Sequence, residues 1–156
     1  MSEPEIPKGS KLFPIQLKRV DVGEIHYACS AFSVARIDPI SDFELETGLS
    51  EVTPDTKIFQ ISLGFVAKTD PEKTGLDLPY TLVVRVHGQF EVLSDAFPSD
   101  KLEKWAHLNG TAVLLPFLRE TVHSITAKSG FKPFIMPLIE APLYRVAPPS
   151  VAASKV

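Results

Sequence analysis

Between residues 109 and 146, an amphipathic helical pattern is followed directly by an apolar segment that prolines interrupt. Asn109 or Thr111 can cap the start of this helix, because a short polar side chain accepts a hydrogen bond from an orphan backbone N–H. Pro116 then falls within the first turn or so, where a missing N–H costs least. Gly130 is suited to the left-handed stop. The residues with the spacing of one apolar helix stripe are Leu114, Leu115, Leu118, Val122 and Ile125.

The segment after the helix, FKPFIMPLIEAPLYRV, is apolar but contains Pro133, Pro137 and Pro142. Proline cannot donate to a β-ladder, so this segment cannot form an interior strand of a sheet. We expect it to lie along a surface, as extended chain or as an edge. Its large apolar side chains must either be buried against neighbouring elements or be offered to a partner. They are Phe131, Phe134, Ile135, Met136, Leu138 and Ile139.

Upstream of the helix, several stretches carry the patterns of β-strands. In residues 13–28 the apolar alternation changes phase near Lys18 and Arg19 and again at Gly23, which indicates a long strand with a β-bulge. Residues 42–50 alternate as a half-exposed strand. Residues 57–68 and 78–93 also alternate, and the turn-forming loop between them predicts an antiparallel hairpin. Residues 30–41 have no clear period and are interpreted as a crossing loop.

The order of these elements predicts an α+β protein. Four strands come first, then a short helix at 101–108 that Ser99 or Asp100 can cap, then the long helix. We expect a meandering four-stranded antiparallel sheet with one long helix packed on one face. Residues 1–11 and 147–156 are predicted to be disordered tails around a single domain at 12–146.

Composition excludes several classes of function. The 156 residues include 16 Lys+Arg against 19 Asp+Glu, so no basic field attracts nucleic acid. The single cysteine, Cys29, excludes an internal disulfide and a thiolate zinc site built by one chain. No apolar run approaches the roughly 20 residues that cross a bilayer. The first residues lack the apolar centre of a signal peptide. These observations predict a cytoplasmic protein without membrane insertion.

Signals for catalysis are weak. Glu120 and His123 form an E-x-x-H pair one helical turn apart, which is half of a di-iron motif, but the sequence has no second copy. A solvated or interface helix face is the favoured interpretation. His26 and Cys29 are three residues apart on a predicted strand and would point to opposite faces, which favours a buried cysteine over a nucleophile. Phosphate loops, nucleotide fingerprints and nucleophile elbows do not occur. We therefore predict neither an enzyme nor a cofactor.

A strand ends in a Gly-x-Phe step at Gly88 and Phe90, and the helix and tail after it carry Leu115, Pro116, Phe117, Arg119, Glu120, Gly130, Phe131, Pro133 and Pro137. In these residues the chain resembles the SecB-type export chaperones. The resemblance covers roughly residues 13–143 and implies a four-stranded antiparallel sheet with a long helix, assembled as a homotetramer, a dimer of dimers. The second, C-terminal helix of that family is expected to be short or missing here, because residues 143–156 are few and broken by proline.

This resemblance implies an ATP-independent holdase that binds unfolded or nascent polypeptides in apolar grooves, for export or to protect an aggregation-prone client. Apolar burial suits such binding because it is non-directional and tolerates any sequence. The alternative is a dedicated chaperone of an antitoxin in a toxin–antitoxin–chaperone system. The divergent SecB-like branch, some of whose members guard an antitoxin, also lacks a well-formed second helix. An enzyme of unknown type is the third class.

We expect the client groove between the crossing loop and the segment after the helix. Met136 suits contact with varied partners, because its side chain is flexible and polarizable. Half or more of the candidates could instead fill the core, and Phe43 and Leu138 are the first expected to do so. The predicted client-binding residues are Phe32, Val34, Phe43, Phe134, Met136, Leu138 and Ile139.

Two further surfaces follow from the resemblance. The helix face that carries the apolar stripe is expected to be core, and the opposite face is predicted to pack between dimers. Export members of the family dock the motor protein SecA through an acidic patch on the sheet. Glu24 matches one of those positions, whereas the others fall on Ala28 and Val83, so Glu24 is the one candidate motor contact. The predicted oligomer interface is Phe117, Thr121, Ser124 and Lys128.

Overall fold

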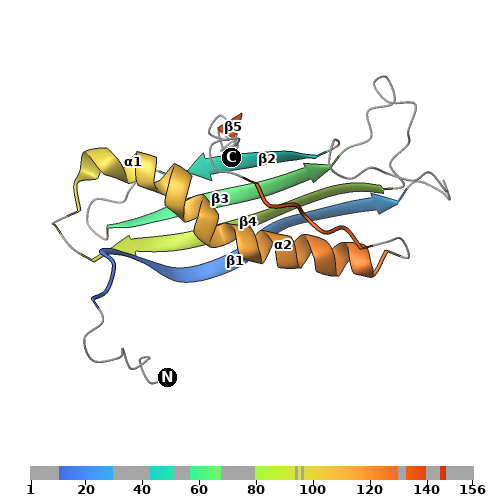
Figure 1. Ribbon diagram of the computed structural model, residues 1–156, viewed down its shortest axis with the longest axis horizontal. Coiled ribbons are helices and arrows are strands. Elements are labelled where there is room, and N and C mark those ends of the chain that lie inside the picture. Colours follow the sequence, from blue (N-terminus) through green and yellow to red (C-terminus); the bar gives the residue numbers. More distant parts are fainter. Residues whose placement is uncertain are drawn as a thin grey trace, which may run out of the picture.

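In the computed structural model, strands form one sheet and a helical segment lies across one of its faces (Figure 1). The described residues are 11–29, 43–50, 57–67, 80–93, 95, 97–129, 133–139 and 145–146. The two predicted tails lie outside them except for Lys11, as do Gly130 and Phe131. The strands are β1 (Ile15–Cys29), β2 (Glu44–Leu49), β3 (Ile58–Ala67), β4 (Tyr80–Val92) and β5 (Arg145–Val146). The helical elements are η1 (Ser99–Lys101), α1 (Leu102–Trp105), η2 (Ala106–Gly110) and α2 (Thr111–Ala127).

The strand order is β1-β4-β3-β2-β5. Neighbours among β1 to β4 are antiparallel, whereas the two-residue β5 is parallel to β2. The four-stranded antiparallel sheet and the hairpin of β3 and β4 are thus confirmed, but the predicted meander is wrong. β1 lies beside β4, which makes the four strands a Greek key. Alternation tells which side chains share a face but not which strands are neighbours, so the sequence pattern could not give this order.

Two bulges keep the apolar residues of β1 on the face that carries the helix. The register against β4 shifts between Leu17 and Arg19 and between Val22 and Glu24. These are the places where the sequence alternation changes phase, so the predicted bulging is confirmed. An extra residue at each place returns the next apolar residue to the same face. As a result Leu17, Val20, Val22, Ile25 and Tyr27 lie opposite Phe90, Gly88, Val86, Val84 and Leu82.

The core lies between the sheet and α2, which packs on β3 and β4. The helix stripe is core as predicted, and α2 approaches β4 closely at Gly88. A Cβ atom added to Gly88 would lie 2.6 Å from Cδ2 of Leu114, so a larger residue there would separate the helix from the sheet. The residues with essentially no exposed surface include Phe59, Ile61, Leu63, Leu82, Val84, Val86, Phe90, Leu114, Leu118 and Val122.

The helical segment continues from Ser99 to Ala127, so the predicted boundary near residue 109 is wrong. A π-helical turn, η2, joins α1 to α2, and Gly110 keeps helical backbone angles. Thr111 caps no helix start; its hydroxyl donates to the His107 carbonyl at 2.6 Å. No side chain caps η1 or α1 either. Pro116 lies inside α2, not in a first turn. No helix in the described part of the chain is long and apolar enough to span a bilayer.

The part of the chain described beyond α2 contains no helix. Residues 133–139 have no regular secondary structure, and residues 145–146 form β5 at the edge of β2. Figure 1 shows this segment passing from the end of α2 across the helix side of the sheet toward β2. The fold is therefore the expected α+β fold with one long helix, and a short fifth strand completes it.

Candidate functional site

Residues 133–139 bury and expose their side chains in turn. Phe134 and Met136 are 5% and 7% exposed, whereas Ile135 and Leu138 are 75% and 91% exposed. Phe134, Ile135 and Met136 follow the alternation of extended backbone, but Leu138 is exposed two residues after the buried Met136, so the alternation breaks at Pro137. Phe134 and Met136 hold the segment against the core, whereas Ile135 and Leu138, which we call the outward row, face solvent. The segment thus buries some of its apolar side chains against neighbouring elements and exposes others, so both possibilities that the sequence allowed occur.

Phe134 holds the segment in an aromatic cluster with Phe65 of β3 and with Phe43, the residue before β2. Its ring centroid lies 5.5 Å from that of Phe65 and 5.6 Å from that of Phe43, the latter in an edge-on arrangement. Phe43 in turn stacks on Phe65 at 5.2 Å. Offset and edge-on rings at these separations attract beyond their simple burial. This cluster fixes where the segment crosses the sheet.

Two side chains of α2 hold the backbone of the segment. The Thr126 hydroxyl accepts a hydrogen bond from the Phe134 N–H at 3.0 Å and donates to the Val122 carbonyl at 2.9 Å. Arg119 Nη2 donates to the Pro137 carbonyl at 2.8 Å. These bonds satisfy the Phe134 N–H and the Pro137 carbonyl, which have no strand partner in the described structure. The outward row is therefore presented at a defined place.

The predicted client-binding residues do not all share one surface. Phe32 and Val34 lie outside the described residues. The structure buries Phe134 and Met136 in the core of this protomer, whereas Phe43 and Ile139 are partly buried against it. The expectation that Leu138 fills the core is wrong: its side chain is exposed, although strict alternation from Phe134 and Met136 would turn it inward. Ile135 was missing from the predicted set, although the same alternation, counted from Phe134, would have identified it.

α2 presents a second exposed surface on its side away from the core. We call it the outer helix strip: Val113, Phe117, Thr121, Ser124 and Lys128, of which Val113, Phe117 and Lys128 are exposed. Val22 and Ile25 of β1 are exposed as well, although the bulges place them on the helix-bearing face. They remain uncovered because α2 packs mainly on β3 and β4.

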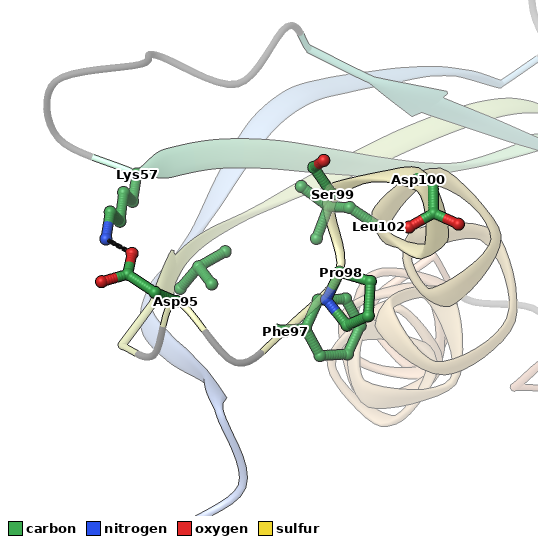
Figure 2. A pocket seen from close by; sticks show the side chains of 8 residues that line it. Lys57, Asp95, Phe97, Pro98, Ser99, Asp100 and Leu102 are labelled. Atoms are coloured by element: carbon green, nitrogen blue, oxygen red, sulfur yellow. Dashed lines mark hydrogen bonds and ion pairs between the residues drawn. The ribbon is translucent and has the colours of Figure 1, made fainter.

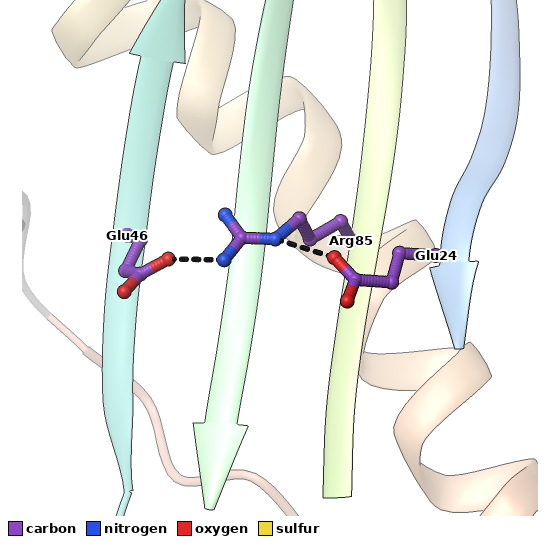
Figure 3. A network of polar contacts seen from close by, with 3 residues as sticks. All are labelled: Glu24, Glu46 and Arg85. Carbon is purple, nitrogen blue, oxygen red and sulfur yellow. Dashed lines mark hydrogen bonds and ion pairs between the residues drawn. The ribbon is translucent and has the colours of Figure 1, made fainter. Parts of the chain in front are cut away.

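The opposite face of the sheet carries an ion-pair network (Figure 3). Arg85 of β4 donates from Nε to Glu24 of β1 at 2.8 Å, and its Nη2 lies 2.7 Å from Oε2 of Glu46 of β2. The guanidinium reaches across β3 at Gly64, where an added Cβ would lie 3.4 Å from Cγ and Nη1 of Arg85. Glu24, the candidate motor contact, is thus ion-paired with a cation that it shares with Glu46.

A pocket of about 460 Å³ lies at the start of the helical segment (Figure 2). Its lining is Lys57, Val92, Asp95, Phe97, Pro98, Ser99, Asp100 and Leu102. The hydrogen bond and charge of Lys57 hold the pKa of the Asp95 carboxyl below its usual range. Both partners of this ion pair are exposed, so solvent screens it and it contributes little to stability.

Metal-ligating side chains are scattered over the described surface. Glu120 and His123 are both exposed on α2, as the solvated-face interpretation expects. Across the described ranges, His, Cys, Asp and Glu side chains form no group of three that could hold a metal ion. The most distinctive chemical feature of the molecule is therefore its exposed apolar side chains.

Comparisons with known proteins agree on one family. The family model described as SecB, preprotein translocase subunit SecB, matches residues 17–146. An uncharacterized protein of Methanocaldococcus jannaschii is 33% identical over 104 residues, which are 67% of this chain and 62% of that relative. The chain thus matches less than two thirds of that relative's length.

A solved structure shares the fold. It is the Mycobacterium tuberculosis Rv1957 SecB-like chaperone in complex with a ChAD peptide from the Rv1956 HigA1 antitoxin. The TM-score is 0.66 at 17% identity, and the match covers 83% of this chain and 93% of that one. At this identity, the similarity concerns the arrangement of the sheet and the long helix.

Proposed function

Because the chain belongs to the SecB family, we propose that it is an ATP-independent chaperone that holds unfolded polypeptides on an apolar surface. The observation that carries this proposal is the outward row, where Ile135 and Leu138 are 75% and 91% exposed on a segment that the core holds in place. Burying each such side chain against a client contributes about 1.5–3 kcal/mol. A backbone that is already ordered loses little entropy on binding.

The proposed client surface combines residues with two roles. Ile135 and Leu138 touch the client, while Phe43 and Ile139 form its partly buried margin. Phe134 and Met136 act from beneath the surface, because their packing sets the position of the outward row. Phe32 and Val34, which lie outside the described residues, are proposed as further client contacts.

We propose that the outer helix strip and the free edge of β1 join copies of the chain into a homotetramer, a dimer of dimers. β1 has β4 as its one strand neighbour in the described sheet, and an edge of this kind invites pairing with a second chain. Phe117 on α2 and Val22 and Ile25 on β1 offer exposed apolar surface. Isologous contacts of this type close into dimers.

A dedicated antitoxin chaperone is the second candidate function. It is supported by the fold shared with a SecB-like chaperone that binds an antitoxin peptide. The alternative export role includes docking of SecA on the sheet at Glu24. The pairing of Glu24 with Arg85 counts against a free acidic patch there. For a dedicated antitoxin chaperone, the client would be one aggregation-prone partner with an extended apolar segment.

Light scattering tests these alternatives. Several unrelated proteins and one candidate antitoxin are diluted from denaturant with the chaperone at a stoichiometric ratio. Suppressed aggregation of all clients supports the general holdase, and suppression for the antitoxin alone supports the dedicated chaperone. If no client is protected, both proposals are rejected.

A further inference from the structure

β2 forms the edge of the antiparallel sheet, and the chain covers part of this edge with its own strand. β5 lies beside β2 and pairs Arg145 with Glu46 and Val146 with Thr47 (Figure 1). β2 has six residues, and β5 has two. Opposite Leu45, Gly48 and Leu49, the described residues supply no strand partner on this side. Among the described residues, this edge is therefore paired only in its middle.

β5 is a weak partner for this edge. It pairs in parallel, and parallel ladders are slightly less stable per residue than the antiparallel ladders of the rest of the sheet. In the described ladder β5 pairs with two of the six residues of β2, Glu46 and Thr47, so it contributes few backbone hydrogen bonds to this edge.

We propose that β5 is a placeholder, and that an extended segment of the client displaces it and pairs with β2. This inference rests on the proposed holdase function. The chain's own β5 demonstrates that extended backbone fits this edge, and main-chain pairing accepts clients of any sequence. The segment that carries the outward row leads across the sheet toward the same edge. A client can therefore contact Ile135 and Leu138 and continue along β2.

A placeholder lowers the apparent affinity for clients. When the binding-competent form is only part of the population, the apparent Kd equals the intrinsic Kd divided by that fraction. Weakening β5 should therefore strengthen client binding without changing any residue of the proposed client surface. This direction of effect separates a placeholder from a strand that serves only stability.

The test compares two double variants in the full chain. Arg145→Pro with Val146→Pro removes the backbone donors of β5, since proline has no N–H. Arg145→Ala with Val146→Ala changes the same side chains and keeps the donors. Affinity is measured by fluorescence anisotropy of labelled, reduced and carboxymethylated α-lactalbumin, a permanently unfolded polypeptide. We expect the proline variant to lower the Kd by about 3- to 10-fold and the alanine variant to keep the wild-type Kd.

An unchanged or higher Kd for the proline variant overturns the placeholder. If the wild-type chain does not bind the unfolded probe at all, the proposed holdase function fails instead, so the two failures are distinct. Hydrogen exchange on the wild-type chain gives a second measurement. Added client should speed exchange of the amides at Arg145 and Val146 while β2 stays protected. Slower exchange at these two residues overturns the displacement.

Discussion

The outward row and the outer helix strip both expose apolar side chains, but they rest on different backbones. The outward row lies on extended, proline-containing chain that is held by Phe134 and by hydrogen bonds from Thr126 and Arg119. The outer helix strip lies on α2, whose backbone groups are satisfied within the helix. Extended chain suits varied polypeptides, because its alternating side chains match those of another extended segment. A helix has a fixed surface, which suits a second copy of the same chain.

The largest effect is expected at the anchor beneath the outward row. Phe134→Ala should lower the free energy of unfolding by about 3–5 kcal/mol, because it empties a packed aromatic site. Ile135→Ala is the matched control, and it should change this free energy by less than about 0.5 kcal/mol because its side chain is largely exposed. Denaturant titrations followed by the fluorescence of Trp105, the single tryptophan, measure both. Equal losses for the two variants would contradict the burial of Phe134 and the exposure of Ile135.

The next effect concerns client binding by the outward row itself. Ile135→Ser together with Leu138→Ser should weaken binding of an unfolded polypeptide by about 10- to 100-fold, since two apolar contacts are lost. The mass in solution and the unfolding midpoint should not change. Leu93→Ser removes an exposed leucine at a position remote from this segment and should leave binding intact. If Leu93→Ser weakens binding of the unfolded polypeptide as much as the double variant does, clients bind to exposed apolar surface in general, and the outward row has no special role.

Assembly should respond to the outer helix strip. Phe117→Glu places a charge on this strip and should weaken association by about tenfold or more, because the buried area of one aromatic ring is lost and a charge is desolvated. Analytical ultracentrifugation then shows smaller species, while each protomer keeps its fold. Glu120→Gln, an exposed change on the same helix, is the control. An unchanged mass for Phe117→Glu would remove this strip from the interface.

The smallest effect is expected far from both surfaces, at the exposed pair of Lys57 and Asp95. The pKa of Asp95 is lowered in the folded state by Lys57, so the carboxylate stabilises the fold at neutral pH. This contribution is lost as the pH falls through the lowered pKa. Asp95→Asn should therefore lower the Tm slightly at pH 7 and not at strongly acidic pH. A larger difference in acid than at pH 7 would reverse the expected sign.

Local patterns predicted much of the fold and part of the candidate site. The phase changes at Lys18 and Gly23 located the bulges of β1, because a side-chain period of two must be reset wherever an extra residue enters. The helix stripe identified Leu118 and Val122 as core in the same way. The burial of Phe134 was not predicted, since it depends on Phe43 and Phe65, which are distant in sequence.

By itself, the sequence determined which side chains share a face, where β1 bulges and that one long helix carries an apolar stripe. These are local properties, set by the repeat of strand and helix backbone along the chain. Only the tertiary structure decided that β1 lies beside β4. It likewise made the helix continue through Gly110 and turned Leu138 outward while Phe134 fills the core. Each of these outcomes depends on packing between segments that are distant in sequence. Close contacts between such segments can outweigh the conformational preferences of the individual residues.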